Sequence, residues 1–136
     1  MKLRWLDSMS VGVMEFDNDH KQMLQLMAEI AADLRQGKEE PARQRIIDLQ
    51  ALTQSHIVRE RLFLQRIRFP HVEAAITAQK ELLSHITTLE AVAPKDARAM
   101  VSLMEEAFVT YLLRGEVNYK CFVEFAGHSD VPSCDR

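Results

Sequence analysis

Apolar residues along this chain recur every three or four positions, the spacing that places side chains on one face of an α-helix. Four separate segments show this pattern. The stripes of the first two are His20, Leu24, Met27, Ala31 and Leu34, followed by Ile46, Leu49, Thr53, His56, Glu60, Phe63 and Ile67. Those of the last two are Val72, Ala75, Ile76, Gln79, Leu82, Leu83, Ile86 and Leu89, followed by Val101, Met104, Phe108, Tyr111, Leu112, Gly115, Tyr119 and Phe122. The pattern predicts four long amphipathic helices.

The residues around the first two stripes indicate where those helices begin and end. Asp17-Asn18-Asp19 can accept hydrogen bonds from the unpaired N–H groups of a first helical turn, so we expect the first helix to start there. Residues 1–16 then form an irregular N-terminal arm. Gly37 suits the end of this helix, and Pro41 suits the first turn of the second helix.

Two prolines mark the remaining boundaries. The residue before a proline is disfavoured in helices, so Phe69-Pro70 ends the second helix and the third follows it. Pro94 suits the first turn of the fourth helix, which we expect to run unbroken to Gly127. The helices and their short loops predict an all-α fold, an up-down-up-down four-helix bundle over residues 1–126 with the N-terminal arm. Residues 127–136 are expected to form a loose C-terminal tail.

The composition narrows the class of protein. Lys and Arg total 17 against 20 Asp and Glu, and the net charge of −3 argues against a nucleic-acid binder, because such proteins carry a basic excess. No stretch approaches the roughly 20 apolar residues that span a bilayer, and the first residues do not resemble a secretion signal. Cys121 and Cys134 do not form a disulfide framework. We therefore expect a cytoplasmic protein with no membrane contact.

Three polar residues fall on apolar stripes. His56 and Glu60 are four positions apart, so their side chains lie on one face of the second helix, and His20 begins the stripe of the first helix. A buried carboxylate is costly unless it is paired or binds a cation. Two imidazoles and one carboxylate would give a metal ion three ligands and leave positions open for water or a small molecule. The alternative is a hydrogen-bonded histidine–glutamate pair in the core, without metal.

Several segments resemble those of bacterial hemerythrins. Trp5 and the stretch Ser10-Val11-Gly12-Val13-Met14-Glu15-Phe16-Asp17-Asn18-Asp19-His20-Lys21-Gln22-Met23 are similar to the opening of that family. The stretch His56-Ile57-Val58-Arg59-Glu60-Arg61 is similar to its His-Phe-x-x-Glu-Glu segment. Phe69-Pro70 and Tyr111-Leu112 resemble its aromatic-proline and Trp-Leu pairs. The resemblance spans nearly the whole chain and implies a four-helix bundle with an N-terminal arm.

The resemblance also implies a ligand set. Hemerythrins use five histidines, one glutamate and one aspartate to hold two bridged irons that bind O₂ reversibly. Three of these ligands are present, namely His20, His56 and the bridging Glu60. The other four positions are substituted, by Ala75, Gln79, Gly115 and Lys120. The first iron thus keeps both of its histidines and a carboxylate, while the second loses its terminal ligands.

The alignment of the fourth helix leaves one alternative. A shift of one residue would place Glu116 and Cys121 at the two ligand positions of that helix. Glu116 and Gln79 are therefore weak additional metal candidates. In either alignment we expect at most one Fe or Zn ion, and a di-iron centre is not expected.

Three functions remain open at this point. The first is a hemerythrin-like interaction or sensory module with a mononuclear Fe or Zn site, and the second is the same module without metal, kept for signalling. The third is a functional hemerythrin-type protein that binds iron and oxygen. An enzyme is not expected, because the serines and carboxylates show no arrangement of a nucleophile beside a base.

A basic run in the second helix is a candidate face for a protein partner. It consists of Arg59, Arg61, Arg66 and Arg68. Apolar residues alternate with these arginines, so the alternative is the solvated side of an amphipathic helix.

Overall fold

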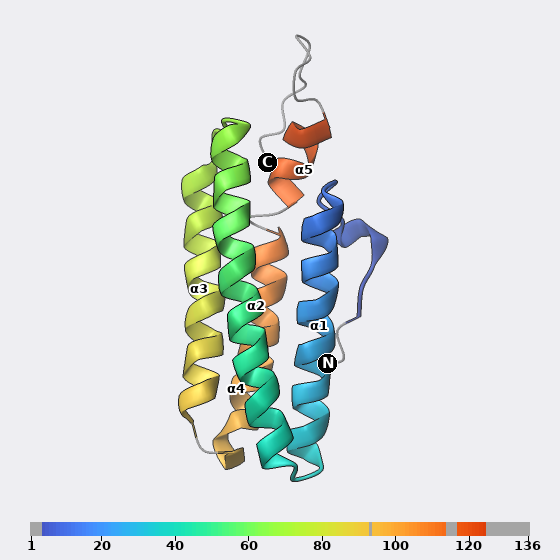
Figure 1. The fold of residues 1–136 in the computed structure, drawn as a ribbon, viewed down its shortest axis with the longest axis vertical. Coiled ribbons are helices and arrows are strands. Elements are labelled where there is room, and N and C mark those ends of the chain that lie inside the picture. Colours follow the sequence, from blue (N-terminus) through green and yellow to red (C-terminus); the bar gives the residue numbers. More distant parts are fainter. Residues whose placement is uncertain (1–3, 93, 114–116, 125–136) are drawn as a thin grey trace.

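The computed structural model describes residues 4–92, 94–113 and 117–124 of the 136-residue chain. These residues form helices and contain no strand. The long helices are α1 (Met14–Arg35), α2 (Glu39–Arg66), α3 (Val72–Ala91) and α4 (Pro94–Tyr111). A 3-10 turn, η1 (Asp7–Met9), precedes them, and a short helix, α5 (Val117–Glu124), follows them. The four long helices lie side by side, an arrangement compatible with a helical bundle (Figure 1).

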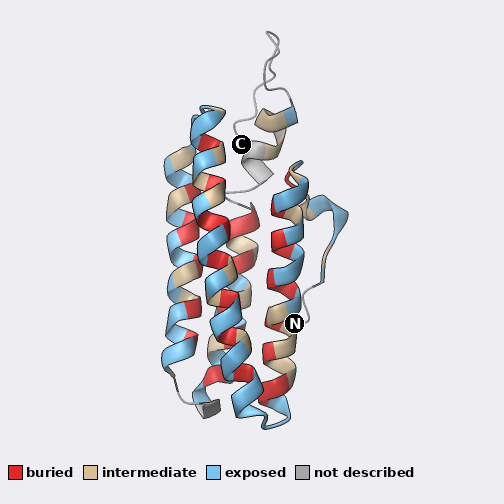
Figure 2. Cartoon of the chain, in the orientation of Figure 1, coloured by how far each residue is buried: buried red, intermediate tan, exposed pale blue. Residues whose placement is uncertain are grey.

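The long helices enclose a common interior. α1 packs against α2 and α4, and α3 packs against the same two helices from the other side. Buried residues lie mainly on the sides of the helices that face one another, whereas the outer sides are exposed (Figure 2). None of the described helices is both long enough and apolar enough to cross a membrane.

Most of the predicted helix boundaries are confirmed. α1 ends just before Gly37, whose φ of +71° belongs to the left-handed region that glycine adopts without strain. Pro41 lies in the first turn of α2, and α2 ends before Phe69-Pro70. Pro94 is the first residue of α4. These boundaries depend on the local backbone preferences of glycine and proline, so they can be predicted from the sequence.

The predicted start of the first helix is wrong. α1 begins at Met14, so Asp17 lies inside its first turn instead of before it. The Asp17 carboxylate accepts hydrogen bonds from the Ser10 hydroxyl at 2.6 Å and from the Val11 N–H at 2.8 Å. The aspartate therefore fastens the N-terminal segment, residues 4–13, to the side of α1 and does not cap the helix.

The segment predicted as the fourth helix is described in two parts, α4 and α5. α4 ends at Tyr111, Leu112 and Leu113 continue in a wider π-type turn, and α5 begins only at Val117. Gly115 falls in the interval between the two helices and lies outside the described residues, as does the predicted tail over residues 127–136. The apolar periodicity did not indicate the π-type turn at Leu112 and Leu113.

Two apolar clusters fill the interior. The larger cluster draws on all four long helices and includes Met27, Leu49, Leu82, Met104 and Phe108. The smaller cluster contains Val11, Phe16, Leu64, Phe69 and Ala75, with Phe122 and Val123 of α5 packed against it. It closes the end of the helices where α1 begins and α2 ends.

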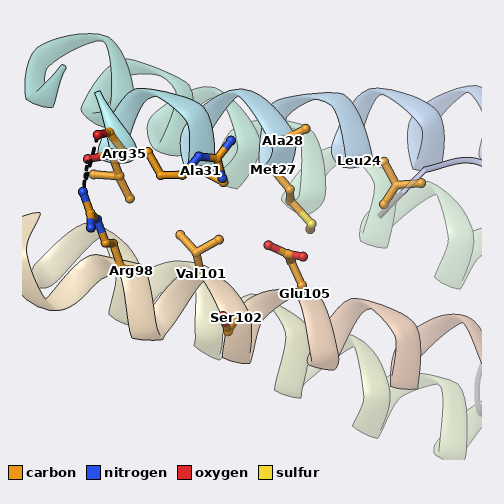
Figure 3. A pocket seen from close by; sticks show the side chains of 10 residues that line it. Leu24, Met27, Ala28, Ala31, Arg35, Arg98, Val101, Ser102 and Glu105 are labelled. Carbon is orange, nitrogen blue, oxygen red and sulfur yellow. Dashed lines mark hydrogen bonds between the residues drawn. The ribbon is translucent and has the colours of Figure 1, made fainter. Parts of the chain in front are cut away.

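A cavity of about 490 Å³ lies between α1 and α4 (Figure 3). Its lining residues are Leu24, Met27, Ala28, Ala31, Leu34, Arg35, Arg98, Val101, Ser102 and Glu105. The Arg98 guanidinium donates hydrogen bonds to the carbonyl oxygens of Leu34 and Arg35, the last carbonyls of α1, at 3.3 and 3.5 Å. Glu105 is partly buried in this cavity, and burial raises its pKa above the usual 4.5 despite the attraction of Arg35.

This raised pKa predicts a dependence of stability on pH. The folded chain binds the Glu105 proton more tightly than the unfolded chain, so the free energy of unfolding falls as pH rises from the unfolded pKa through the folded one. We expect Glu105→Gln to be more stable than the native chain at pH 7, by no more than about 0.5 kcal/mol, because solvent screens a partly exposed carboxyl. The difference should disappear near about pH 3, where the carboxyl is protonated in both states. Urea unfolding at several pH values measures it.

The matched control for this prediction is Glu106→Gln, because Glu106 is exposed on the same helix. This variant should stay within about 0.5 kcal/mol of the native chain, as is usual for an exposed substitution. A Glu105→Gln variant that is less stable than the native chain at pH 7 would contradict the prediction.

Candidate metal centre

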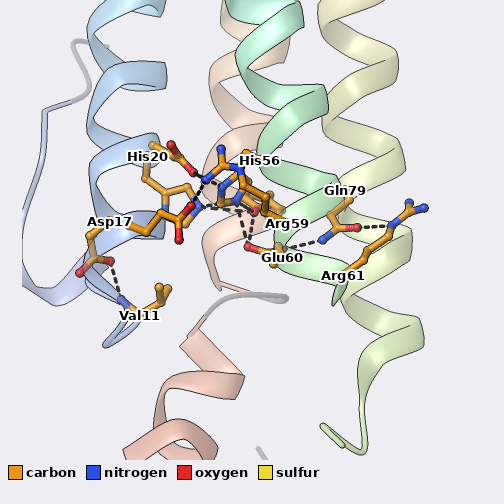
Figure 4. A network of polar contacts seen from close by, with 11 residues as sticks. Val11, Asp17, His20, His56, Arg59, Glu60, Arg61 and Gln79 are labelled. Atoms are coloured by element: carbon orange, nitrogen blue, oxygen red, sulfur yellow. Dashed lines mark hydrogen bonds and ion pairs between the residues drawn. The ribbon is translucent and has the colours of Figure 1, made fainter. Parts of the chain in front are cut away.

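The three polar residues singled out in the sequence meet in the interior. His20 comes from α1, and His56 and Glu60 come from α2 (Figure 4). All three side chains are fully buried, at 0% exposure. The ring of His56 contacts Phe16 edge to face, and the ring of His20 contacts Phe108 in the same way. The polar group therefore lies between the smaller and the larger apolar cluster.

The distances within this group are those of a potential metal site. The Nε2 atoms of His20 and His56 are 3.1 Å apart, and His56 Nε2 is 2.9 Å from Glu60 Oε2. One ligand atom from each of the three residues lies within 4.8 Å of the other two. His20, His56 and Glu60 could therefore hold a metal ion. No other such group of His, Cys, Asp or Glu occurs among the described residues.

A fourth polar atom, which the sequence analysis missed, belongs to Tyr111 at the end of α4. Its hydroxyl lies 2.7 Å from His56 Nε2 and 3.4 Å from His20 Nε2, and it donates a hydrogen bond to Glu60 Oε2 at 2.9 Å. The sequence placed Tyr111 in an apolar stripe and treated it as core. The signal that could have identified it is that a buried tyrosine hydroxyl usually has a polar partner.

The contacts at His56 Nε2 exceed what one nitrogen can satisfy. The hydroxyl of Tyr111, the carboxylate of Glu60 and the imidazole of His20 approach this atom at 2.7, 2.9 and 3.1 Å. An imidazole nitrogen carries either one hydrogen or one lone pair. The nitrogen can therefore form one good hydrogen bond, but it cannot form good hydrogen bonds with all three atoms at once. A cation among these atoms could instead accept a lone pair from each.

The other nitrogen of His56 faces a carboxylate. His56 Nδ1 lies 2.8 Å from Asp19 Oδ2, and the Arg59 guanidinium lies 2.9 Å from the same oxygen. Burial alone would raise the pKa of Asp19, but its hydrogen bonds with His56 and Arg59 and the positive charge of Arg59 outweigh burial and lower this pKa. Asp19 therefore accepts the Nδ1 hydrogen, which leaves the Nε2 lone pair directed at the centre. The sequence analysis missed this role and predicted a helix cap.

The second oxygen of Glu60 is held by an amide. Gln79 of α3 donates from Nε2 to Glu60 Oε1 at 2.6 Å, and Arg61 donates from Nε to Gln79 Oε1 at 2.8 Å. The second bond fixes which way the Gln79 amide faces. Glu60 consequently directs Oε2 towards His56 and Tyr111 while Oε1 is occupied by Gln79.

The substituted ligand positions do not form a second centre among the described residues. Ala75 belongs to the smaller apolar cluster. Gln79 faces Glu60, as a hydrogen-bond donor. Lys120 is partly buried on α5, and its Cγ lies 3.8 Å from the position that a Cβ on Gly12 would take. Gly115 and Glu116, and the side chain of Cys121, lie outside the described residues.

The four arginines proposed as a partner face have different surroundings. Arg59 points towards α1, where it pairs with Glu15 as well as Asp19. Arg61 points towards α3 and donates to Gln79. Only Arg66 and Arg68 are exposed. The first two arginines thus support the polar group from opposite sides, and a partner-binding role for the run stays a prediction.

Comparison with known proteins finds no family model, no curated protein and no solved structure that matches this chain. The likeness to hemerythrins therefore rests on the motif residues alone.

The hydrogen bond between Gln79 and Glu60 can be tested in the metal-free chain. Gln79→Leu keeps most of the side-chain volume but removes the donor at 2.6 Å from a fully buried carboxylate. We expect a loss of about 1–3 kcal/mol in the free energy of unfolding. Urea denaturation in the presence of a chelator measures it. Gln54→Ala, an exposed change on α2, is the control and should stay within about 0.5 kcal/mol of the native chain. Equal stability of the two variants would contradict the role given to Gln79.

Proposed function

We propose that this chain is a hemerythrin-like protein, an up-down-up-down four-helix bundle with an N-terminal arm, that binds one metal ion through His20, His56 and Glu60. The ion is Fe or Zn. The protein works as an interaction or sensory module in the cytoplasm and does not act as a normal O₂ carrier or as an enzyme.

The crowding at His56 Nε2 is the observation that carries this proposal. Three polar atoms lie 2.7–3.1 Å from one buried nitrogen that can form only one good hydrogen bond. A cation removes the conflict, because each neighbour can then direct a lone pair at the ion. It also supplies the positive charge that a carboxylate with no exposure to water requires.

The spacing of the donor atoms fits a common ion. Two donors that each lie about 2.1 Å from one ion are about 3.0 Å apart when their bonds meet at a right angle, and about 3.4 Å apart at the tetrahedral angle. The separation of 3.1 Å between the histidine nitrogens falls in this range, and that of 2.9 Å between His56 and Glu60 lies just below it. Both Fe and Zn accept imidazole and carboxylate ligands.

The residues behind the ligands also favour a metal site. A histidine that binds metal usually donates its other ring N–H to a carboxylate or carbonyl, which orients the ring. Asp19 lies in that position beside His56. Gln79 has the corresponding role for Glu60, since it occupies one carboxylate oxygen and leaves the other facing the histidines.

One ion fits the surroundings better than two. The position that a hemerythrin would use for a second-iron histidine is Ala75, which is buried among apolar side chains. Gln79 is already bonded to both Glu60 and Arg61. The groups that remain on the α3 side therefore support the first site and offer no imidazole for a second.

A sensory role follows from the position of the ion between two helices. Metal that binds the folded chain stabilises it, and here it would join α1 to α2. The N-terminal segment is fastened to α1 through Asp17, close to His20 in the same helix. Loading of the site would thus change the stability of a surface element, which a protein partner can detect. Exposed Arg66 and Arg68 are the candidate contacts for that partner.

Metal analysis tests the proposed ligands. We expect about one ion per chain in the purified protein or after loading with Fe(II) or Zn(II), because three ligands converge on one point. His20→Ala, His56→Ala and Glu60→Ala should each abolish stable binding, whereas His85→Ala, a change on α3, should retain it. The measurement is metal content per folded chain, with helicity followed by circular dichroism.

The alternatives give different results in this measurement. Two irons per chain and an oxo-bridged absorption band with O₂ would establish the functional hemerythrin-type oxygen binder. A native chain that stays folded but takes up no metal under any loading condition would refute the site, and the buried group would then be a hydrogen-bonded core.

Asp19 provides a separate test of the residues that hydrogen-bond to the proposed ligands. Asp19→Asn keeps the size of the side chain but weakens the acceptor for His56 Nδ1. We expect the affinity for Zn(II) to fall by about 10–100-fold, the usual cost of losing such a partner. Glu15→Gln is the matched control, because Glu15 is exposed and pairs with Arg59 instead of with His56. Similar affinities in both variants would show that Asp19 does not orient His56. Competition with a chromogenic chelator measures the affinity.

A further inference from the structure

The hydroxyl oxygen of Tyr111 lies beside the three proposed ligands and is a fourth potential metal donor. We propose that the Tyr111 oxygen binds the metal as a phenolate together with His20, His56 and Glu60, so that the site prefers Fe(III) to Zn(II) or Fe(II). This inference rests on the proposed function, because it adds a ligand to the same site.

The distances place the Tyr111 oxygen in the same shell as the other donors. It lies 2.7 Å from His56 Nε2, 2.9 Å from Glu60 Oε2 and 3.4 Å from His20 Nε2. These separations bracket the two distances given above for the proposed ligands, 2.9 and 3.1 Å. An ion that touches the histidines and the glutamate would therefore also reach the phenol oxygen.

The position of Tyr111 is fixed by packing. Its side chain is 1% exposed, and its ring lies edge to face against His20 at 5.6 Å between centroids. The neighbouring Phe108, one turn earlier in α4, contacts the rings of both Tyr111 and His20. The hydroxyl is thus held at the centre by the apolar packing of α4, and the ion would join three helices.

Binding as phenolate is a ligand exchange without electron transfer. The O–H bond of Tyr111 would break as its oxygen bonds the ion in place of a water ligand, and the phenol proton and that water would pass to solvent. Its present acceptor, Glu60 Oε2, becomes a ligand in the same step. Phenolate is a hard, anionic oxygen donor, and such donors favour small ions of high charge. The Tyr111 phenol would therefore lose its proton more readily to Fe(III) than to Zn(II).

The preference has a consequence for function. Two anionic ligands, the Glu60 carboxylate and the Tyr111 phenolate, stabilise the ferric state relative to the ferrous state. Reversible O₂ binding requires Fe(II), so the same feature disfavours an oxygen carrier. A site that holds Fe(III) tightly and Fe(II) weakly responds to the oxidation state of iron, which suits a sensory module.

Substitution of each tyrosine tests the proposal. The chain has two tyrosines, Tyr111 and Tyr119. The native protein loaded with ferric citrate should show a visible phenolate-to-Fe(III) charge-transfer band. Tyr111→Phe, which keeps the ring but removes the oxygen, should lose this band. Its Fe(III) affinity should fall by at least about 100-fold, because even the loss of a residue that only hydrogen-bonds to a metal ligand lowers affinity by about 10–100-fold. Its Zn(II) affinity should change by less than about tenfold. Tyr119→Phe, the control, should keep both the band and the affinity.

The possible results separate this inference from the proposed function. A native chain that binds no metal refutes both. A native chain whose metal depends on His20, His56 and Glu60, but whose ferric form has no charge-transfer band, refutes only the role of Tyr111. Loss of the band in Tyr119→Phe alone does the same. If Tyr111→Phe does not fold, resonance Raman spectra of the native ferric protein decide, because phenolate ring modes must then be enhanced.

Discussion

The burial of Glu60 beside His56 is the constraint on which the rest of the interior depends. Neither side chain reaches water, so apart from each other their polar partners come from the neighbouring helices. α1 supplies His20 and Asp19, α3 supplies Gln79, and α4 supplies Tyr111. Apolar contacts alone allow helices to slide past one another at modest cost. A sliding of one turn here would break all of these contacts, so the polar group fixes how the four helices align.

The sequence predicted the helices well because their apolar periodicity and their Gly and Pro boundaries are local signals. The same periodicity identified His20, His56 and Glu60, since polar residues on an apolar stripe are conspicuous. It failed where a residue acts at long range. Asp17 and Asp19 have the composition of a helix cap, but their partners are Ser10 and, 37 positions away, His56. A local sequence preference cannot show whether a carboxylate caps a helix or accepts a hydrogen bond from a distant residue.

Two further features could not be predicted for geometric reasons. Tyr111 is 55 positions from His56, and its ring satisfies the apolar pattern whether or not its hydroxyl has a polar partner. The arginine run was interpreted as one face, yet residues two positions apart differ by about 200° around a helix. Arg59 therefore reaches α1 while Arg61 reaches α3. Arg59 supports His56 through Asp19, and Arg61 supports Glu60 through Gln79.

This chain of contacts connects the centre to the surface in a defined order. Arg59, partly exposed, holds Asp19, which holds His56; Arg61 holds Gln79, which holds Glu60. The orientations of His56 and Glu60 are thus each supported by an arginine at the edge of the bundle. Two of the four arginines of the basic run, Arg59 and Arg61, are therefore committed to contacts inside the bundle that support the buried polar group.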